Sequence, residues 1–410
     1  MRAGASTQVI AFPEGFFPAE GFTKQLDALH VRALVLEQEV RIALLVAELT
    51  SLPPEEIAVL TKILAEQTGA EACFVCVSHT FSAPHLMPDH VLKSEAEREK
   101  KRQLQAVLRK AARDAAKAAT AILQNATVCV GVGSCGVCGN RDIETKNGWW
   151  VTNGRSGPTD RAMTVLRLDA EDGSPLAALV HYAVQSSVLD GAQLCGGGKA
   201  VSGDLAGLMC SALEAEMGGI PVLFLPGACG DQAPIRKARY FESGADGEMN
   251  EVDMQDDAIL VCRELADQMT REAMKALMNA EPMDDGRICI DRRSVTVPAK
   301  NMNHDLRQLR PTRIAPYEAA GECEQTVELL QIGRMKLICV KPELNCVTAR
   351  AIMAGDPWVR VATLVNGGAK YMADAASYDR ITYEAMNSPF GKGAAERLTE
   401  TAKALLQERI

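Results

Sequence analysis

The chain has 410 residues, of which 47% are hydrophobic and 24% are charged, a composition typical of globular domains. Its formal net charge of −9 argues against a nucleic-acid partner. No stretch approaches the roughly 18 consecutive apolar residues of a membrane span, and the N-terminus has no apolar signal segment. Most of the 13 cysteines lie in apolar runs, so we expect a reducing, cytoplasmic location.

The first part of the chain predicts strands and helices in turn. Two apolar runs within 31–48 predict a pair of strands. A serine, two prolines and two acids at 51–56 predict the start of a helix that ends near Gly69. The apolar run at 72–78 predicts a buried strand. Leucines and alanines at helical spacing predict a long helix over 92–124, whose charges alternate in sign as on a solvated face.

The rest of the chain continues this alternation. As far as residue 225 we expect a strand at 128–132, a Gly- and Asn-rich loop at 133–158, a hairpin of strands 163–168 and 177–183, a Gly-rich loop at 191–203, a helix at 204–217 and a strand at 222–225. Beyond it we expect a helix at 253–280, strands at 287–298, 325–332 and 335–341, a helix at 346–354, a strand at 359–365, and helices at 375–386 and 391–408.

The alternation of strands and helices predicts an α/β fold with mixed β-sheets flanked by helices. We expect a single domain over residues 1–410, because no repeat or low-complexity segment divides the chain. The only linker-like stretch, 299–322, is a candidate subdomain boundary.

One histidine stands out by its position. The segment Ser78-His79-Thr80-Phe81-Ser82-Ala83-Pro84 directly follows the predicted strand at 72–78. The carboxyl ends of strands are where open α/β sheets bind their ligands. A single histidine at a strand end is more often a structural residue, so the other motifs decide its meaning.

Several common motifs are present only in part. A G-x-G-x-x-G match at 131–136 is followed by loop residues instead of the helix that a dinucleotide site requires. The glycines and lysine at 196–199 precede Ala200, where a phosphate loop needs Ser or Thr. Two C-x-x-C pairs, at 73–76 and 135–138, are too far apart for a zinc ribbon. The sequence contains neither G-x-S-x-G nor H-E-x-x-H.

A scattered set of polar residues remains, all at predicted strand ends or at turns that lead into helices. Because such ends meet at one edge of an α/β sheet, we expect the set to share a crevice. Its members are His79, Asn140, Arg141, His181, Gln185, Ser202, Asp204, Asp231, Glu343, Tyr371 and Tyr383.

The order of these motifs resembles the catalytic domain of neutral, non-lysosomal ceramidases and their shorter bacterial relatives, from about Leu29 to the end of the chain. The matching segments are 78–84 with S-H-T-H-S-G-P, 140–141 with N-R, 179–188 with a strand that ends in H-P-T-S, 202–204 with S-G-D, 230–234 with G-D-V-S-P, 342–343 with P-G-E, and 366–396 with the family's tyrosine-rich tail. Because the chain stops there, we expect no counterpart of the immunoglobulin-like domain of full ceramidases.

The resemblance implies a zinc amidase, in which two histidines, a glutamate and a tyrosine hold the ion and the ion activates water against an N-acyl amide. By position, the family's zinc ligands fall on His79, Glu343, Tyr371 and, in place of the second histidine, Gln185. The catalytic candidates are Arg141 and Tyr383, which match residues that line the family's site, and Asp231 of the 230–234 motif.

Three positions depart from the family pattern. Gln185 replaces a zinc histidine, and a carboxamide oxygen is a poor zinc ligand. Phe81 replaces a histidine beside the reacting centre, and Ala233 replaces a serine implicated in catalysis. His181 cannot take the place of Gln185, because four residues along a strand span about 13 Å. His85 and His90 are nearer to His79 in sequence and are the remaining candidates.

Two hypotheses follow. The first is a divergent zinc-dependent hydrolase of an N-acyl amide or a related small substrate, with very low activity on ceramide because groups that act in the transition state are missing. The alternative is a non-catalytic relative that binds a small ligand or a partner in the former active-site crevice. The sequence makes no prediction of the oligomeric state.

Overall fold

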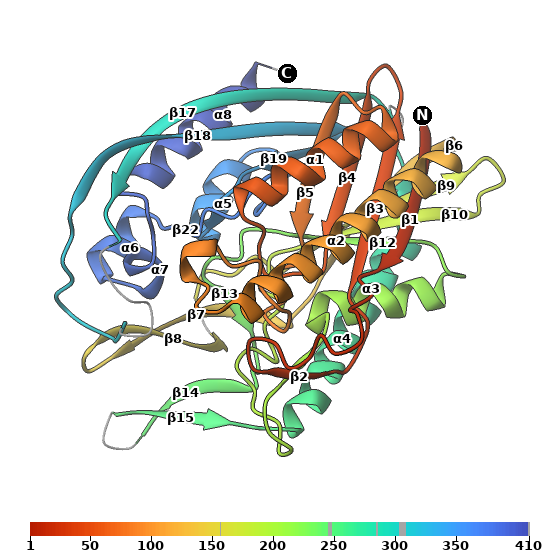
Figure 1. The fold of residues 1–410 in the computed structure, drawn as a ribbon. Coiled ribbons are helices and arrows are strands. Elements are labelled where there is room, and N and C mark those ends of the chain that lie inside the picture. The colour runs from red at the N-terminus through yellow and green to blue at the C-terminus, as the bar shows by residue number, and fades with distance from the viewer. Residues whose placement is uncertain (156, 245–247, 284–285, 303–308, 409–410) are drawn as a thin grey trace.

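The computed structural model describes residues 1–155, 157–244, 248–283, 286–302 and 309–408. Two β-sheets share a hydrophobic core, and helices cover their outer faces (Figure 1). The predicted α/β class with mixed sheets flanked by helices is therefore confirmed.

The larger sheet has nine strands. Its order is β12 (Val222–Pro226), β10 (Pro175–Tyr182), β9 (Ala162–Ala170), β6 (Gln124–Ser134), β1 (Arg2–Val9), β3 (His30–Glu37), β4 (Arg41–Ala47) and β5 (Ala72–Val77), with β16 (Glu281–Pro282) beside β6. Only the pairs at its two ends, β10 with β12 and β4 with β5, are parallel. The sheet is curved, because β12 at one end contacts β3, β4 and β5 at the other. A right-handed twist that accumulates over many strands explains how the two ends approach each other.

The smaller sheet consists of β17 (Ile288–Lys300), β18 (Ala319–Ile332), β19 (Met335–Cys339) and β21 (Val359–Ala362). The long ribbon of β17 and β18 arches over one side of the molecule (Figure 1). The predicted linker-like stretch 299–322 includes the adjoining ends of these two strands and the connection between them, and its residues 303–308 lie outside the described part of the chain. The division of the chain into one domain or two subdomains stays a prediction.

The strands alternate between two cores, as the two-residue period of a strand requires. In β4, Ala43 and Leu45 face the helices α1 and α2, whereas Leu44 and Val46 face the core between the sheets. The other half of the larger sheet packs against α3 and α4, and the smaller sheet packs against α5 and α8.

The helices follow the capping signals of the sequence. Helix α1 begins with Pro54 and ends at Gly69, which has a φ of 66°. Helix α2 starts at a capping box in which Ser94 and Glu97 bond each other's backbone. The predicted helix at 375–386 is two helices, because Ile381 adopts a φ of 55° and Thr382 caps the second. The helices are α1 (Pro54–Thr68), α2 (Glu95–Ala121), α3 (Asp204–Glu216), α4 (Asp257–Met278), α5 (Cys346–Met353), α6 (Ala375–Arg380), α7 (Tyr383–Met386) and α8 (Ala394–Gln407).

The predicted loop at 133–158 is wrong. Most of it forms an antiparallel hairpin of β7 (Cys138–Thr145) and β8 (Gly148–Arg155), and β7 also pairs with β13 (Gln232–Pro234). The glycines that suggested a loop serve close packing of strands. A Cβ on Gly139 would lie 2.5 Å from the Arg155 carbonyl oxygen, and one on Gly154 would lie 2.1 Å from the Ala233 oxygen.

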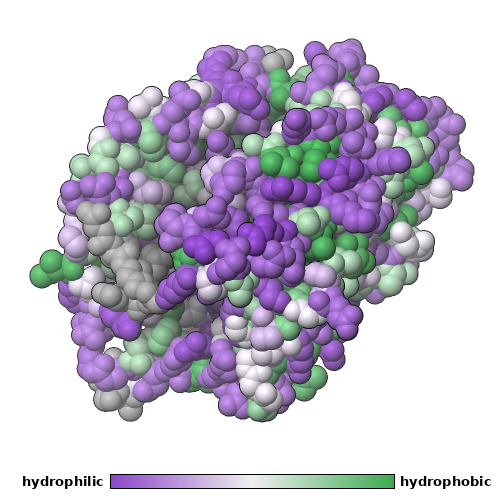
Figure 2. Space-filling view, in the orientation of Figure 1, coloured by the Kyte–Doolittle hydropathy of each residue, from purple (hydrophilic) through white to green (hydrophobic). Residues whose placement is uncertain are grey.

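Three further short pairs complete the fold. They are β2 (Phe22–Gln25) with β11 (Lys199–Val201), β14 (Arg239–Ser243) with β15 (Met249–Asp253), and β20 (Glu343–Leu344) with β22 (Tyr371–Met372). In the described residues, no helix is both long and apolar enough to cross a membrane. The face in Figure 2 is mainly hydrophilic, with hydrophobic residues in small separate areas.

Candidate metal centre

His79 is held in an unusual backbone conformation at the end of β5. Its φ of 61° is rare for a residue with a side chain, and such strain is typical of functional positions. Strands β4 and β5 are parallel and end together, which brings Thr50 beside His79. The Nδ1 of His79 donates to the Thr50 carbonyl oxygen over 2.6 Å. This bond leaves Nε2 as the ring nitrogen that can act as a ligand, the arrangement found in metal-binding histidines.

Glu343 and Tyr371 come from the neighbouring strands β20 and β22. These strands are parallel, and Glu343 pairs directly with Tyr371. The Oε2 atom of Glu343 lies 3.1 Å from Nε2 of His79. All three side chains are buried, with exposed fractions of 7% or less. Two of the ligands implied by the resemblance therefore touch, and the third is adjacent.

Gln185 and Cys229 reach the same point from a second pair of parallel strands. Tyr182 of β10 pairs with Pro226 of β12, and each of the two residues lies three positions beyond its strand's paired end. Gln185 Nε2 donates to Glu343 Oε2 over 2.7 Å. The sulfur of Cys229 lies 3.9 Å from the same oxygen.

Arg141 closes the centre on the side of β7. Its Nη1 donates to Gln185 Oε1 over 2.7 Å, and its Nε and Nη2 lie 2.8 and 2.7 Å from Oε1 of Glu384. The guanidinium carbon lies 5.3 Å from the ring centre of Tyr371 and 5.6 Å from that of Tyr383. Five of the seven site residues taken from the resemblance, His79 and Glu343 included, thus form one connected group.

That group comprises His79, Glu343, Gln185, Arg141 and Tyr371, with Tyr383 packed against its edge. Asp231 is not part of the group. Its carboxylate accepts from Asn140 Nδ2, Gln232 Nε2 and the backbone N–H of Cys346 at 2.8–2.9 Å. Its carbonyl oxygen accepts from the Arg141 backbone N–H over 2.9 Å, so Asp231 positions the strand that carries Arg141.

Burial and charge shift the pKa values of the group. Burial lowers the pKa of His79, but the charge and hydrogen bond of Glu343 outweigh it, and the pKa is raised. Burial raises the pKa of Glu343, but His79 outweighs it, and the pKa is lowered. Burial, reinforced by the Glu343 charge, raises the pKa of the Cys229 thiol well above its usual value. Burial raises the pKa of Asp231 to about 6, despite its hydrogen bonds.

The donor atoms fit a metal ion. The Nε2 of His79 is buried and has no hydrogen-bond partner of good geometry, and it lies with the Cys229 sulfur and a Glu343 oxygen inside a group whose atoms are all within 4.8 Å of one another. Tetrahedral zinc with bonds of about 2.0–2.3 Å separates its ligands by roughly 3.3–3.8 Å. The measured separations of 3.1 and 3.9 Å are close to these values. In the described part of the chain, no other group of three such side chains meets the same test.

The amide of Gln185 is turned the wrong way for a ligand. Its oxygen accepts from Arg141, and its nitrogen points at Glu343. Exchanging the two atoms would set an NH₂ group against a guanidinium and an oxygen against a carboxylate, so the charges on both sides fix this orientation. The geometry does not support the expectation that Gln185 binds the ion.

The other two departures from the family pattern are apolar side chains, of which Phe81 contacts the centre. The Phe81 ring packs edge-on against His79, with ring centres 4.7 Å apart. Ala233 is fully buried in β13. His181 Nε2 donates to the Val361 carbonyl oxygen over 2.8 Å, and His85 Nδ1 is paired with Glu20. His90 is exposed in a short 3₁₀ turn. None of the three histidines takes the place of Gln185.

Sequence reasoning missed Cys229 and Glu384. Cys229 lies in a loop between Ala228 and Gly230, and no motif of the sequence marks it as a ligand. The parallel register of β10 and β12 is the signal that places it beside Gln185. Glu384 lies next to Tyr383 on α7, and its fully buried carboxylate is the counter-ion of Arg141.

A polar cavity reaches the centre at Arg141. It has a volume of about 280 Å³, near the lower end for small-molecule sites. Half of its lining residues are charged. The complete lining consists of Arg141, Val151, Thr152, Asp190, Gly191, Lys237, Arg239, Tyr240, Phe241 and Glu251.

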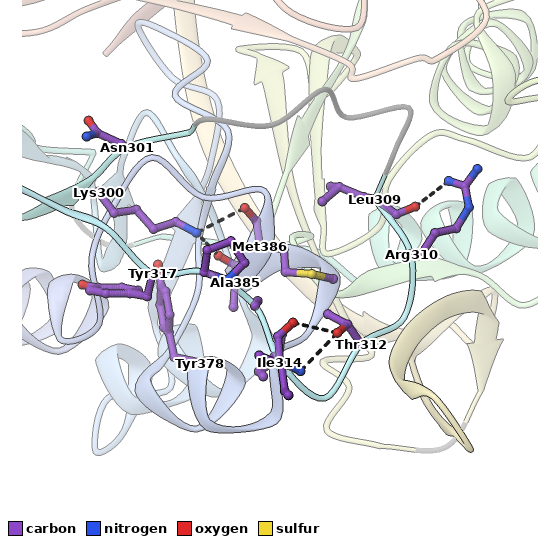
Figure 3. Close-up of a pocket in the computed structure, with 13 residues that line it drawn as sticks. Lys300, Asn301, Leu309, Arg310, Thr312, Ile314, Tyr317, Tyr378, Ala385 and Met386 are labelled. Carbon is purple, nitrogen blue, oxygen red and sulfur yellow. Dashed lines mark hydrogen bonds between the residues drawn. The ribbon is translucent and has the colours of Figure 1, made fainter.

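A separate cavity of about 300 Å³ lies near the ends of β17 and β18 (Figure 3). Lys300 reaches across it and donates to the carbonyl oxygens of Ala385 and Met386 at 2.5 and 3.1 Å, while Tyr317 and Tyr378 line one side. None of the residues of the candidate metal centre lines this cavity, so the two sites are separate.

Comparison with known proteins identifies the fold. No family model and no curated protein matches the sequence. Solved structures do match, among them a neutral ceramidase from Pseudomonas aeruginosa and a ceramidase complexed with C2. Each of these two matches has a TM-score of 0.73 at 15% sequence identity, and covers 100% of this chain and 75% of the chain of the known structure. The protein therefore has the fold of neutral ceramidase, as the order of its motifs predicted.

Proposed function

We propose that this protein is a metal-dependent hydrolase of an N-acyl amide or a related small substrate, and that ceramide is not its preferred substrate. The observation that carries the proposal is the convergence of His79 Nε2 and Glu343 Oε2, 3.1 Å apart in a buried centre next to Arg141. The ion, zinc by the chemistry of its donors, supplies Lewis-acid polarisation and a water of lowered pKa when it is bound.

The protein's own groups orient the reaction. The Thr50 carbonyl fixes the His79 ring so that Nε2 faces Glu343. Burial lowers the pKa of Arg141, but Tyr371 and Glu384 outweigh it, so the guanidinium stays charged. Because Arg141 borders both the centre and the polar cavity, it binds the amide oxygen of a substrate and stabilises the negative charge that develops there.

Three observations favour a substrate other than ceramide. Phe81 and Ala233 offer no proton donor or acceptor, and each general acid or base typically contributes a factor of about 10²–10⁴ in rate. The cavity is small, and half of its lining residues are charged, which suits a compact polar molecule better than a lipid with two long chains.

The test is hydrolysis of a panel of short N-acyl amines and N-acyl amino acids, with a long-chain ceramide for comparison, by protein purified without chelator. We expect near-stoichiometric zinc by elemental analysis, and turnover of at least one panel member that is lost in Glu343→Gln. Glu264→Gln, which changes an exposed glutamate paired with Arg236, is the matched control and keeps full activity. Zinc below about a tenth of an equivalent, unchanged after soaking in zinc, would refute the proposal.

A second candidate is a non-catalytic binding protein. The apolar replacements Phe81, which contacts His79, and Ala233 favour it. Under this alternative the protein binds a panel member, measured by calorimetry, without hydrolysing any. Turnover that disappears in Glu343→Gln excludes it.

A further inference from the structure

We propose that Cys229 is a ligand of this metal ion, so that the centre has a His–Cys–Glu donor set in place of a second histidine. The inference rests on the proposed function, because it concerns the same ion. It concerns a residue that no motif of the sequence marked as a ligand.

The first argument is topological. In the neutral ceramidase pattern a histidine follows the strand that corresponds to β10, and here that position is Gln185. Strand β12 is the parallel neighbour of β10, and Cys229 lies as far beyond Pro226 as Gln185 lies beyond Tyr182. The donor that is missing at Gln185, beyond β10, therefore has a substitute in Cys229 at the equivalent position beyond β12.

The second argument is the direction of the side chains. The oxygen of Gln185 is committed to Arg141, and only its N–H groups face Glu343. The Cys229 sulfur, in contrast, belongs to the group of atoms within 4.8 Å that includes His79 Nε2 and a Glu343 oxygen. The centre therefore has three side-chain donors without Gln185.

The third argument concerns what the thiol otherwise contacts. Its polar neighbours are Glu343 Oε2 at 3.9 Å and Thr363 Oγ1 at 3.7 Å, both weak contacts for sulfur. The Thr363 hydroxyl already donates to the Gly227 carbonyl oxygen over 2.7 Å. The thiol is fully buried, so water cannot bind it, and these two weak contacts give its protonated form little stabilisation.

Binding would convert the thiol to a thiolate and release one proton for each ion bound. A thiolate with an imidazole and a carboxylate favours zinc, or cobalt as its substitute, over magnesium, calcium or manganese. The two negative charges of the thiolate and the carboxylate balance the divalent ion inside the buried centre, which lowers the cost of placing it there.

The test is a titration of metal-free protein with Co²⁺, whose bond to a thiolate produces an intense sulfur-to-metal charge-transfer band in the near ultraviolet. We expect the wild type to bind one equivalent and to show the band. Cys229→Ala should lose the band and bind Co²⁺ at least 100-fold more weakly. Cys339→Ala, which changes a buried cysteine outside the candidate centre whose sulfur lies 3.8 Å from the Leu337 carbonyl oxygen, should keep both.

Circular dichroism of the metal-free proteins checks that the variants fold. If Cys229→Ala does not fold, Cys229→Ser replaces one atom and is titrated in the same way. One equivalent of Co²⁺ without the band, or a band that persists in a folded Cys229 variant, overturns the assignment of Cys229 and leaves the proposed hydrolase intact. If His79→Ala and the wild type both fail to bind Co²⁺ or zinc, the proposed function fails as well.

Discussion

His181 is buried with one ring nitrogen unpartnered, and we expect it to make the protein less stable below pH 6.5. Its exposed fraction is 2%, its Nε2 donates to Val361, and its Nδ1 has no partner. Burial lowers the pKa of His181 from 6.5 to about 4, the Val361 bond opposes this, and the charge of Arg360 adds to it. In the unfolded chain the pKa returns to about 6.5.

The direction in which the free energy of unfolding changes with pH follows from proton binding. Between pH 6.5 and 4, His181 binds a proton in the unfolded state but not in the folded state, so the free energy of unfolding falls as the pH falls. One pKa unit corresponds to about 1.4 kcal/mol, so the full loss between pH 6.5 and 4 is about 3 kcal/mol. Above pH 6.5 the residue is neutral in both states and contributes no pH dependence.

The assay is urea unfolding of the wild type and of His181→Gln, whose amide can still donate to Val361, at several pH values from 7.5 to 4. Other groups titrate in both proteins, so the difference between the two free energies isolates His181. We expect this difference to be constant above pH 6.5 and to change by about 3 kcal/mol, in favour of the variant, on going to pH 4. Parallel curves over the whole range would refute the reasoning.

Three further outcomes are expected. Zinc at 100 times its dissociation constant should stabilise the protein by about 2.7 kcal/mol, seen as a higher Tm by calorimetry, and neither a chelator-treated sample nor His79→Ala should show this gain. Arg141→Lys should lower kcat/KM for the best panel substrate by about 10²–10³, since a lysine loses the forked hydrogen bonds to Glu384 and Gln185; a loss below threefold would exclude a role for the guanidinium. Glu48→Gln should cost about 3–5 kcal/mol in urea unfolding, because it removes the buried partner of Arg32; a cost below 1 kcal/mol would show that Glu214 alone suffices.

Much of the fold could be predicted because its signals are local. The apolar runs of β3, β4, β5, β10 and β12 and the caps of α1 and α2 are visible in short windows of sequence. The hairpin of β7 and β8 could not be recognised, because its glycines serve contacts between distant backbones that a window does not contain. The same reason explains the split of the predicted helix at 375–386, which depends on the conformation of Ile381.

In the candidate site, too, some residues could be predicted from local sequence and others depend on the assembled structure. His79, Glu343 and Tyr371 could be proposed because the motifs around them resemble those that carry the zinc ligands of the ceramidase family. The place of Cys229 depends on the pairing of Tyr182 with Pro226, and the orientation of Gln185 depends on Arg141 and Glu343. Register and hydrogen-bond direction are properties of the assembled sheet, so residue type alone could not show that the Gln185 oxygen faces Arg141 or that Cys229 lies beside Glu343.

The curvature of the larger sheet has a consequence for how the protein matures. His79 comes from the β5 end of that sheet, Cys229 from the β12 end, and Glu343 from β20, which lies between β19 and β21 of the smaller sheet in the chain, so these candidate donors meet only when the larger sheet has curved and the smaller sheet has docked against it. Contacts between such remote segments form late and slowly in folding. Under the proposed metal-dependent function, uptake of the ion therefore reports that both sheets have assembled, since a nascent chain that stops before β20 lacks Glu343.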